Sequence, residues 1–147
     1  MPSIIPGYVY TLFAALVVGA ILVSSCSLLM LNLKNEADTR QLANVDEYVA
    51  ARSLNLLAHT STDQQNTTQF LNLPPQIGNQ QYWICLTNDS SQAWVESGFG
   101  ATVGPAQAQA AIPVGIEASG IFVSSWGRAF LSCSQNQTAI LELDGSG

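Results

Sequence analysis

The sequence has little positive charge. Its 147 residues include four Lys and Arg against ten Asp and Glu, which gives a formal net charge of −6 at pH 7. The cations are scattered singly along the chain, at Lys34, Arg40, Arg52 and Arg128. Nucleic-acid binding needs clustered cations that neutralise phosphates. We therefore expect no nucleic-acid partner.

Catalytic and metal-binding motifs are also missing from the sequence. The single histidine, His59, has no Asp or Ser at a known triad spacing, and no phosphate-binding, dinucleotide-binding, hydrolase or zinc-protease motif occurs. Asp46 and Glu47 are adjacent carboxylates, but neighbours on a helix point about 100° apart, which favours solvated positions over an acid–base pair. Neither His59 nor the cysteine spacing fits a metal site. We expect no enzyme, no metal and no cofactor.

Charge is absent altogether from the first 33 residues. A helix over residues 8–33 spans roughly 39 Å at about 1.5 Å per residue, more than the roughly 30 Å of bilayer hydrocarbon. Tyr8 and Tyr10 are placed as interfacial aromatics at one end, and Lys34 begins the charged sequence at the other. A buried core helix would need a large domain around it, and the remaining chain is too small. We predict a membrane-spanning or equally apolar setting for residues 4–33.

Proline and glycine are absent from Lys34 until Pro74. Within this stretch, apolar residues recur at steps of three, four and seven, at Leu42, Val45, Val49 and Leu56. This spacing predicts one apolar helical stripe. We therefore predict a single helix over about residues 8–58, whose amphipathic part, residues 34–58, buries its stripe against the C-terminal domain. Two helices with a break near residues 32–36 are the alternative.

Polar residues on that amphipathic helix have predicted positions. Gln41, Asp46 and Glu47 are expected off the stripe, facing solvent. Arg52 falls on the stripe, where its aliphatic stem can lie along apolar surface.

The hydrophobic period changes to two after a polar linker over residues 60–68. The predicted strands are residues 70–73, 81–87, 92–96, 112–116, 120–124, 128–133 and 138–143. Residues 98–111 carry little signal and are assigned to a loop or edge segment. Seven or so short strands at this spacing favour an antiparallel β-sandwich, Ig-like in type. The predicted fold class is α+β, with a long N-terminal hydrophobic helix over 1–59 and a small β-sandwich head over 69–147.

The head contains several candidate chemical sites. Cys85 and Cys133 fall on predicted strands, and a disulfide between them or two free thiols remain alternatives, since sequence does not fix their distance. Three Asn-X-Ser/Thr sequons in polar stretches are candidates for N-glycosylation, at Asn66, Asn88 and Asn136. Carbohydrate stacking on the tryptophans is a further alternative, but aromatic residues of a small sandwich usually belong to its core or seal its edge, and a core position is the favoured prediction. The tryptophans are Trp83, Trp94 and Trp126.

The layout of a charge-free N-terminal helix, an amphipathic continuation and a small all-β head resembles the archaeal type IV pilins and archaellin-like filament subunits. The resemblance covers the whole chain and rests on architecture. It implies that residues 8–33 form the buried filament helix, 41–58 the helix under the head and 70–143 the head. In this family the apolar helix is first held in the membrane and then packs with its copies into a filament core. The β-domain forms the outer sheath and is often glycosylated.

The resemblance implies a structural, non-enzymatic protein of the cell surface. Its partners are then copies of itself in a helical homopolymer, the membrane before assembly, N-linked glycans and the cell-surface layer. Small residues in the apolar helix let backbones approach closely. They are Ala14, Ala15, Gly19, Ala20, Ser24, Ser25 and Ser27. Cys26, in the same helix, is expected to pack as a small apolar residue.

One feature departs from the family pattern, because no basic residue precedes Ile4. Precursors in this family carry a short basic leader that a prepilin peptidase removes. Either the chain is the mature form, or Met1 is the true start and the protein is not processed as a pilin. The second case favours a single-span, membrane-anchored accessory or stator protein, whose extracellular β-sandwich binds the surface layer or a partner. The run of small residues favours the filament subunit.

Overall fold

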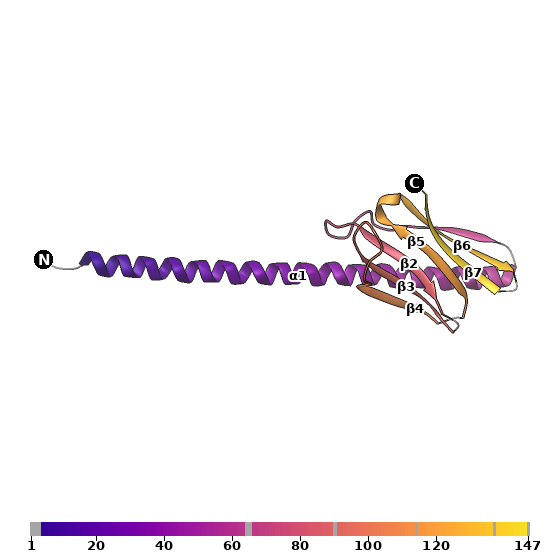
Figure 1. The fold of residues 1–147 in the computed structure, drawn as a ribbon, viewed down its shortest axis with the longest axis horizontal. Coiled ribbons are helices and arrows are strands. Elements are labelled where there is room, and N and C mark those ends of the chain that lie inside the picture. The colour runs from indigo at the N-terminus through magenta and orange to yellow at the C-terminus, as the bar shows by residue number, and fades with distance from the viewer. Residues whose placement is uncertain (1–3, 64–65, 90, 114, 137, 147) are drawn as a thin grey trace. The chain divides into compact units, whose positions relative to one another are not determined.

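The structure is a computed structural model that describes residues 4–63, 66–89, 91–113, 115–136 and 138–146 (Figure 1). Contacts divide the chain into two compact units, Met1–Ala37 and Asp38–Gly147. The described residues of the first unit, 4–37, are all helical. The second contains the rest of that helix and a β-sheet, and we call it the head unit.

One α-helix, α1, runs from Ile4 to Asp63 without a break. The predicted single helix is therefore confirmed, and the alternative break at residues 32–36 is wrong. The helix also continues five residues past the predicted end. Hydroxyl groups stabilise this last turn, because Thr60 Oγ1 donates to Leu56 O at 2.9 Å and Ser61 Oγ donates to Ala58 O at 2.9 Å. The polar linker predicted over 60–68 is correspondingly shorter.

Seven strands follow the helix and form one sheet. Their bounds are β1 (Thr67–Leu71), β2 (Tyr82–Asn88), β3 (Ala93–Phe99), β4 (Ala108–Ile112), β5 (Glu117–Val123), β6 (Arg128–Asn136) and β7 (Thr138–Ser146), with a short 3-10 helix, η1 (Ser124–Trp126), between β5 and β6. The sheet order is β1-β6-β7-β5-β2-β3-β4. Every neighbouring pair is antiparallel except β5 with β7, which is parallel.

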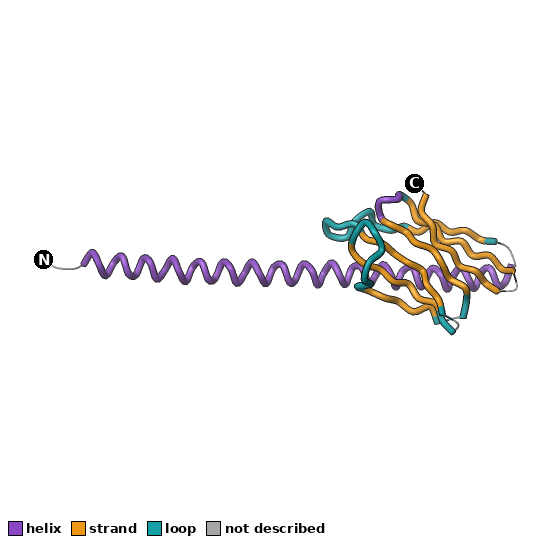
Figure 2. The backbone as a smooth tube through the Cα atoms, viewed as in Figure 1, coloured by secondary structure: helices purple, strands orange, loops and turns teal. Residues whose placement is uncertain are grey.

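The α+β class is confirmed, but the Ig-like sandwich is not. A sandwich needs two sheets packed face to face, whereas these strands belong to a single sheet. The second layer is α1, whose C-terminal part lies along one face of the sheet (Figure 2). The predicted stripe residues Leu42, Val49 and Leu56 are buried in one cluster with residues of the sheet. The amphipathic helix thus takes the place that a second sheet would have.

The two faces of the sheet differ in what they contact. Alternate residues of each strand point to the same face. The inner face packs against α1 and carries the buried residues Leu71, Ile84, Leu86, Val95, Leu131 and Leu141. The outer face, on the other side, carries Phe70, Cys85, Ile121 and Glu142.

Strand boundaries differ most from the prediction at β4. The structure places this strand at Ala108–Ile112, at one edge of the sheet and overlapping the stretch assigned to a loop or edge segment. Of the described residues in the strand predicted over 112–116, only Ile112 belongs to a strand. Ala108, Ala110 and Ile112 face inward, with Gln109 and Ala111 outward. This alternation is regular, but alanine contributes too little apolar surface to give a clear pattern in the sequence.

The two head cysteines are free thiols, so the candidate disulfide between Cys85 and Cys133 is wrong. Strands β5 and β7 separate β2 from β6, which puts the two strands roughly 14 Å apart at about 4.8 Å per strand. A disulfide needs Cα atoms within about 7 Å. The side chains also point to opposite faces, because Cys133 pairs with the buried Leu141 whereas Cys85 pairs with the exposed Ile121.

We expect alkylation of the unfolded but unreduced protein to modify Cys26, Cys85 and Cys133 alike. The intact mass after alkylation should then be the same with and without prior reduction. The unreduced sample provides the measurement and the reduced sample its control. A mass lower by two alkyl groups in the unreduced sample would contradict the separation of the two strands.

The loop between β1 and β2 closes against the start of the head unit's helix. Ile77 and Gln80 exchange backbone hydrogen bonds of 3.1 and 3.0 Å around Gly78, whose φ is +61°. A Cβ at Gly78 would lie 2.7 Å from both carboxylate oxygens of Asp38. Asp38 is buried, and its Oδ2 has no hydrogen-bond partner among the described residues. Glycine is required here both by the backbone conformation and by the close approach.

Asp46 is fully buried, so its predicted solvent-facing position is wrong, whereas Gln41 and Glu47 are exposed as predicted. Asp46 follows Leu42 by four residues and precedes Val49 by three, which places it on the apolar stripe. Its Oδ2 accepts a 2.7 Å hydrogen bond from Ser97 Oγ of β3, while Oδ1 has no partner among the described residues. Desolvation by burial raises the pKa of Asp46 to about 7, with the Ser97 hydrogen bond opposing and the nearby Glu96 charge adding to the rise.

Arg52 lies beside the stripe rather than in its centre. It is half-buried, and its guanidinium carbon lies 5.3 Å from the centroid of the Tyr48 ring, one turn earlier on the helix. This cation–π contact holds the side chain along the helix.

Candidate functional site: the exposed apolar surface of the N-terminal helix

The first unit presents an apolar helical surface with no cover. Of residues 7–33, all are exposed apart from the half-buried Gly19. The large apolar side chains at positions 8–33 are between 43% and 76% exposed. By length and composition, the described residues contain one helix able to cross a membrane. Exposed apolar surfaces of this extent are typical of sites that contact lipid or protein, which makes this surface the candidate site.

The serine and threonine hydroxyl groups of residues 7–33 are bonded within the helix. Thr11 Oγ1 donates to Gly7 O at 2.7 Å, and Ser24, Ser25 and Ser27 donate to the carbonyls four residues earlier at 2.8 to 2.9 Å. A hydroxyl that bonds back to the i−4 carbonyl leaves no donor unsatisfied. These serine and threonine hydroxyl groups therefore do not prevent this surface from entering an apolar environment.

The small residues predicted for helix packing lie on two flanks of α1. Ala15, Gly19 and Ala20 line a shallow apolar groove bordered by Leu12, Leu16, Val23 and Ser24. A Cβ at Gly19 would meet no atom within 4 Å, so the groove is open there. Ser27 falls on the same side at 3.6 residues per turn. Ala14 and Ser25, three turns apart, point to the opposite side.

The two-flank arrangement decides how many neighbours the helix can accommodate. Small residues let helix backbones approach closely. One small-residue flank serves one close neighbour, whereas flanks on opposite sides serve at least two. The sequence predicts which residues are small, and their division between flanks follows from the helical period.

The sequon asparagines have different surroundings. Asn66, just before β1, is exposed, and so is Asn88, the last residue of β2. The turn after Asn88 is fixed by Asp89, whose Oδ1 accepts hydrogen bonds from Ser91 N at 2.7 Å and Gln92 N at 2.8 Å. These hydrogen bonds lower the pKa of Asp89. The side chain of Asn136 lies outside the described residues.

The three tryptophans do not form a stacking platform. Trp83 is buried, but it lies on the same face of β2 as Cys85 and outside the core cluster that packs against α1. Trp94 is half-buried, and its Nε1 donates to Glu96 Oε1 at 2.6 Å. Trp126, in η1, is 43% exposed, so its predicted core position is wrong. A sugar-binding surface would need the tryptophans to present exposed faces together.

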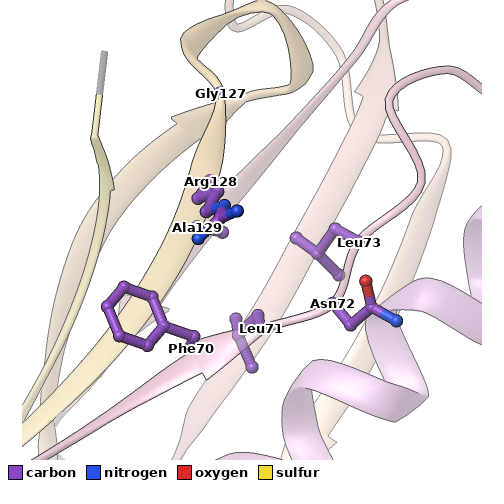
Figure 3. Close-up of a pocket in the computed structure, with 7 residues that line it drawn as sticks. All are labelled: Phe70, Leu71, Asn72, Leu73, Gly127, Arg128 and Ala129. Carbon is purple, nitrogen blue, oxygen red and sulfur yellow. The ribbon is translucent and has the colours of Figure 1, made fainter.

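A hollow of about 350 Å³ lies where β1 ends beside β6 (Figure 3). Phe70, Leu71, Leu73 and Ala129 line it with apolar groups, and Asn72, Gly127 and Arg128 complete the wall. Arg128 is the one titratable residue of this lining. Within the described part of the chain, no three His, Cys, Asp or Glu side chains come together as a metal site would require. His59 is exposed on the last turns of α1 and is not among the residues that line the hollow. Because Arg128 is the one titratable residue of its lining, the hollow has no pair of groups for acid–base chemistry.

None of the protein-family models, curated proteins and solved structures compared with the chain matches it.

Proposed function

We propose that the chain is a pilin, the structural subunit of an extracellular archaeal type IV pilus-like filament that serves adhesion or motility. The exposed apolar helix carries this proposal. Before assembly the helix lies in the cytoplasmic membrane. In the filament, helices of many copies pack together, so contact with protein replaces contact with lipid. The head remains outside, where glycans on Asn66, Asn88 and Asn136 and the cell-surface layer are its proposed partners.

The arrangement of small residues supports the filament over a lone anchor. A single span in lipid needs no close helix neighbour, and large residues all round would serve it equally well. Here the groove at Ala15, Gly19 and Ala20 and the opposite flank at Ala14 and Ser25 provide two surfaces for close packing. No catalytic role is proposed for any residue.

The alternative is a single-span accessory or stator protein whose extracellular head binds the surface layer or a partner. Its support is the length and composition of the same helix, which also suffice for an isolated anchor. Only the filament requires the small residues to contact other copies.

The direct test is the location and N-terminal sequence of the protein in native cells. Cells are sheared, the filaments are separated from the membranes, and the N-terminus of the chain in each fraction is sequenced by mass spectrometry. The proposal expects the chain in the sheared filaments, beginning at or near Met1 and encoded with a longer precursor. A chain that stays with the membranes and is encoded from Met1 would favour the anchored accessory protein.

Replacing Gly19 with leucine should separate membrane insertion from assembly. The monomer has room for the new side chain, since a Cβ at Gly19 meets nothing within 4 Å. Leucine also keeps the segment apolar, so insertion should be unchanged. We expect a loss of at least about tenfold in sheared filament mass, which corresponds to about 1.4 kcal/mol of contact free energy per copy. The measurement is the ratio of filament to membrane protein by immunoblot.

The matched control is Val18→Leu, the adjacent position, which is already large and exposed. It should assemble at the wild-type level. Equal filament mass for Gly19→Leu and Val18→Leu would contradict close packing at the groove.

A further inference from the structure

The sheet of the head unit has two edges, and neither edge strand carries a charged residue or a proline. Strand β1 lies at one end of the strand order and β4 at the other. Both strands are five residues long, with the sequences TTQFL and AQAAI. Neither contains a charged residue or a proline, the groups by which natural proteins commonly prevent edge pairing. Each edge is therefore a template for another strand.

The directions of the two edges are complementary. Stepping through the sheet from β1, the strand direction reverses at every step except the parallel step from β7 to β5. Six steps with one parallel pair give five reversals, so β4 runs opposite to β1. Two heads in the same orientation, placed side by side, thus bring β4 of one antiparallel to β1 of the next. In a fully antiparallel seven-stranded sheet, β1 and β4 would run in the same direction. Two heads in the same orientation would then pair these strands in parallel, which is slightly less stable.

Across such a junction, the inner face of one sheet also continues into the inner face of the next, and the outer face into the outer face. On β1, Thr67, Gln69 and Leu71 face inward, and on β4 the inward residues are Ala108, Ala110 and Ile112. Pairing the strands five on five sets Gln69 opposite Ala110. Inward residues then oppose inward residues, and Thr68 and Phe70 oppose Ala111 and Gln109 on the outer face. A shift of one residue would break this match.

We propose that β1 of one copy pairs with β4 of a second copy, in this register, so that the sheets of neighbouring heads join. The inference rests on the proposed filament, because helical symmetry supplies copies in one orientation. The contact uses two different surfaces of the chain and so propagates from copy to copy instead of closing as a dimer. It adds to the contact between the apolar helices, since it lies entirely in the head.

The exposed Phe70 is consistent with this junction. Its side chain is 68% exposed and stands at the rim of the hollow beside β6 (Figure 3). In the proposed register Phe70 lies directly opposite Gln109 of the next copy. An incoming β4 therefore covers part of an aromatic ring that the isolated head leaves in water.

Cysteine pairs placed across the junction test the proposal. The variant Thr68→Cys with Ala111→Cys sets two outer-face thiols opposite each other, in a chain where Cys26 and Cys85 are replaced by alanine. Directly opposite residues of an antiparallel pair have Cα atoms about 4.5–5.5 Å apart, within the range that a disulfide bridges. After mild oxidation of sheared filaments, non-reducing electrophoresis should show a ladder of covalent multimers that reductant collapses to monomer.

The matched control is Thr68→Cys with Ser119→Cys in the same background. Ser119 is exposed on the outer face of β5, three strands in from either edge, and should give no ladder. A second pair, Phe70→Cys with Gln109→Cys, probes the same register if the first variant fails to assemble. Its filaments should show the same ladder.

Two outcomes overturn the edge pairing while leaving the filament intact. Normal filaments whose subunits stay monomeric after oxidation for both pairs would do so, and so would dimers without higher multimers, which indicate a closed contact. Failure of the proposed function has a different signature, because the unmodified chain would then be missing from the sheared filaments altogether. In that case the edge pairing is overturned with it.

Discussion

Replacing Gly120 with alanine is expected to lower the free energy of unfolding of the head unit by at least about 3 kcal/mol. Gly120 lies in β5 with φ of +131°, a conformation that side chains rarely adopt. A Cβ there would lie 2.6 Å from Leu143 N and still closer to Leu143 O, both backbone atoms of β7. Since backbone cannot rotate away, the parallel β5–β7 pair must separate.

The measurement is urea unfolding of the full chain in detergent, followed by tryptophan fluorescence. All three tryptophans belong to the head unit, so the signal reports this unit and not the apolar helix. The control is Gly104→Ala, at a position where a Cβ meets nothing within 4 Å, and it should change stability by less than about 0.5 kcal/mol. A Gly120→Ala protein as stable as the control would show that β5 and β7 are not paired in this register.

Replacing Asp46 with asparagine is expected to remove a pH dependence from the stability of the head unit. Burial raises the pKa of Asp46 to about 7 in the folded protein, against 3.8 as its ordinary value. Between these two pH values the folded state holds a proton that the unfolded state has released. The stability therefore falls as pH rises from about 4 to about 7, by at most about 1.4 kcal/mol per pH unit. Above pH 7 the contribution of Asp46 to the stability no longer changes with pH.

The asparagine side chain cannot ionise, so the Asp46→Asn variant should lack this slope and exceed the wild type in stability at pH 8. At pH 4 the two proteins should be similar. The measurement is the free energy of unfolding in urea at each pH. The matched control is Glu47→Gln, the exposed neighbour, which should keep the slope. The lowered pKa of Asp89 acts below pH 3.8 and the raised pKa of the Cys85 thiol above pH 9, so neither lies within this window. If the free energies of unfolding of Asp46→Asn and the wild type change with pH in the same way, the pH dependence does not come from a buried Asp46 carboxyl group.

The N-terminal part of the fold is predictable because one strong pattern dominates its sequence. The lack of charge before Lys34 and the spacing of Leu42, Val49 and Leu56 predict a single helix with an apolar first part and an amphipathic second part, as the structure has it. The strands predicted over 128–133 and 138–143 also form, and the structure pairs them as β6 and β7. These features depend on neighbours in the sequence.

Other features depend on contacts between distant residues, and local patterns miss them. Whether strands form one sheet or two depends on what covers the inner face, and here α1 does so. The burial of Asp46 was accessible from its spacing to Leu42 and Val49, but its acidic character argued for solvent. The burial is stabilised by a hydrogen bond that Asp46 accepts from Ser97, which lies 51 residues later in the chain. The candidate site, by contrast, is purely local, so its residues could all be named from the sequence.

The position of β7 in the strand order has a consequence for how the head is made. This last strand is the one link between the pair β1–β6 and the group β5-β2-β3-β4. Until residues 138–146 are available, the head consists of two incomplete sheets with unpaired edges. A chain delivered from its N-terminus, on the ribosome or through a translocation channel, therefore cannot complete the head before β7 has emerged. Residues 7–33 of the apolar helix are available long before that moment.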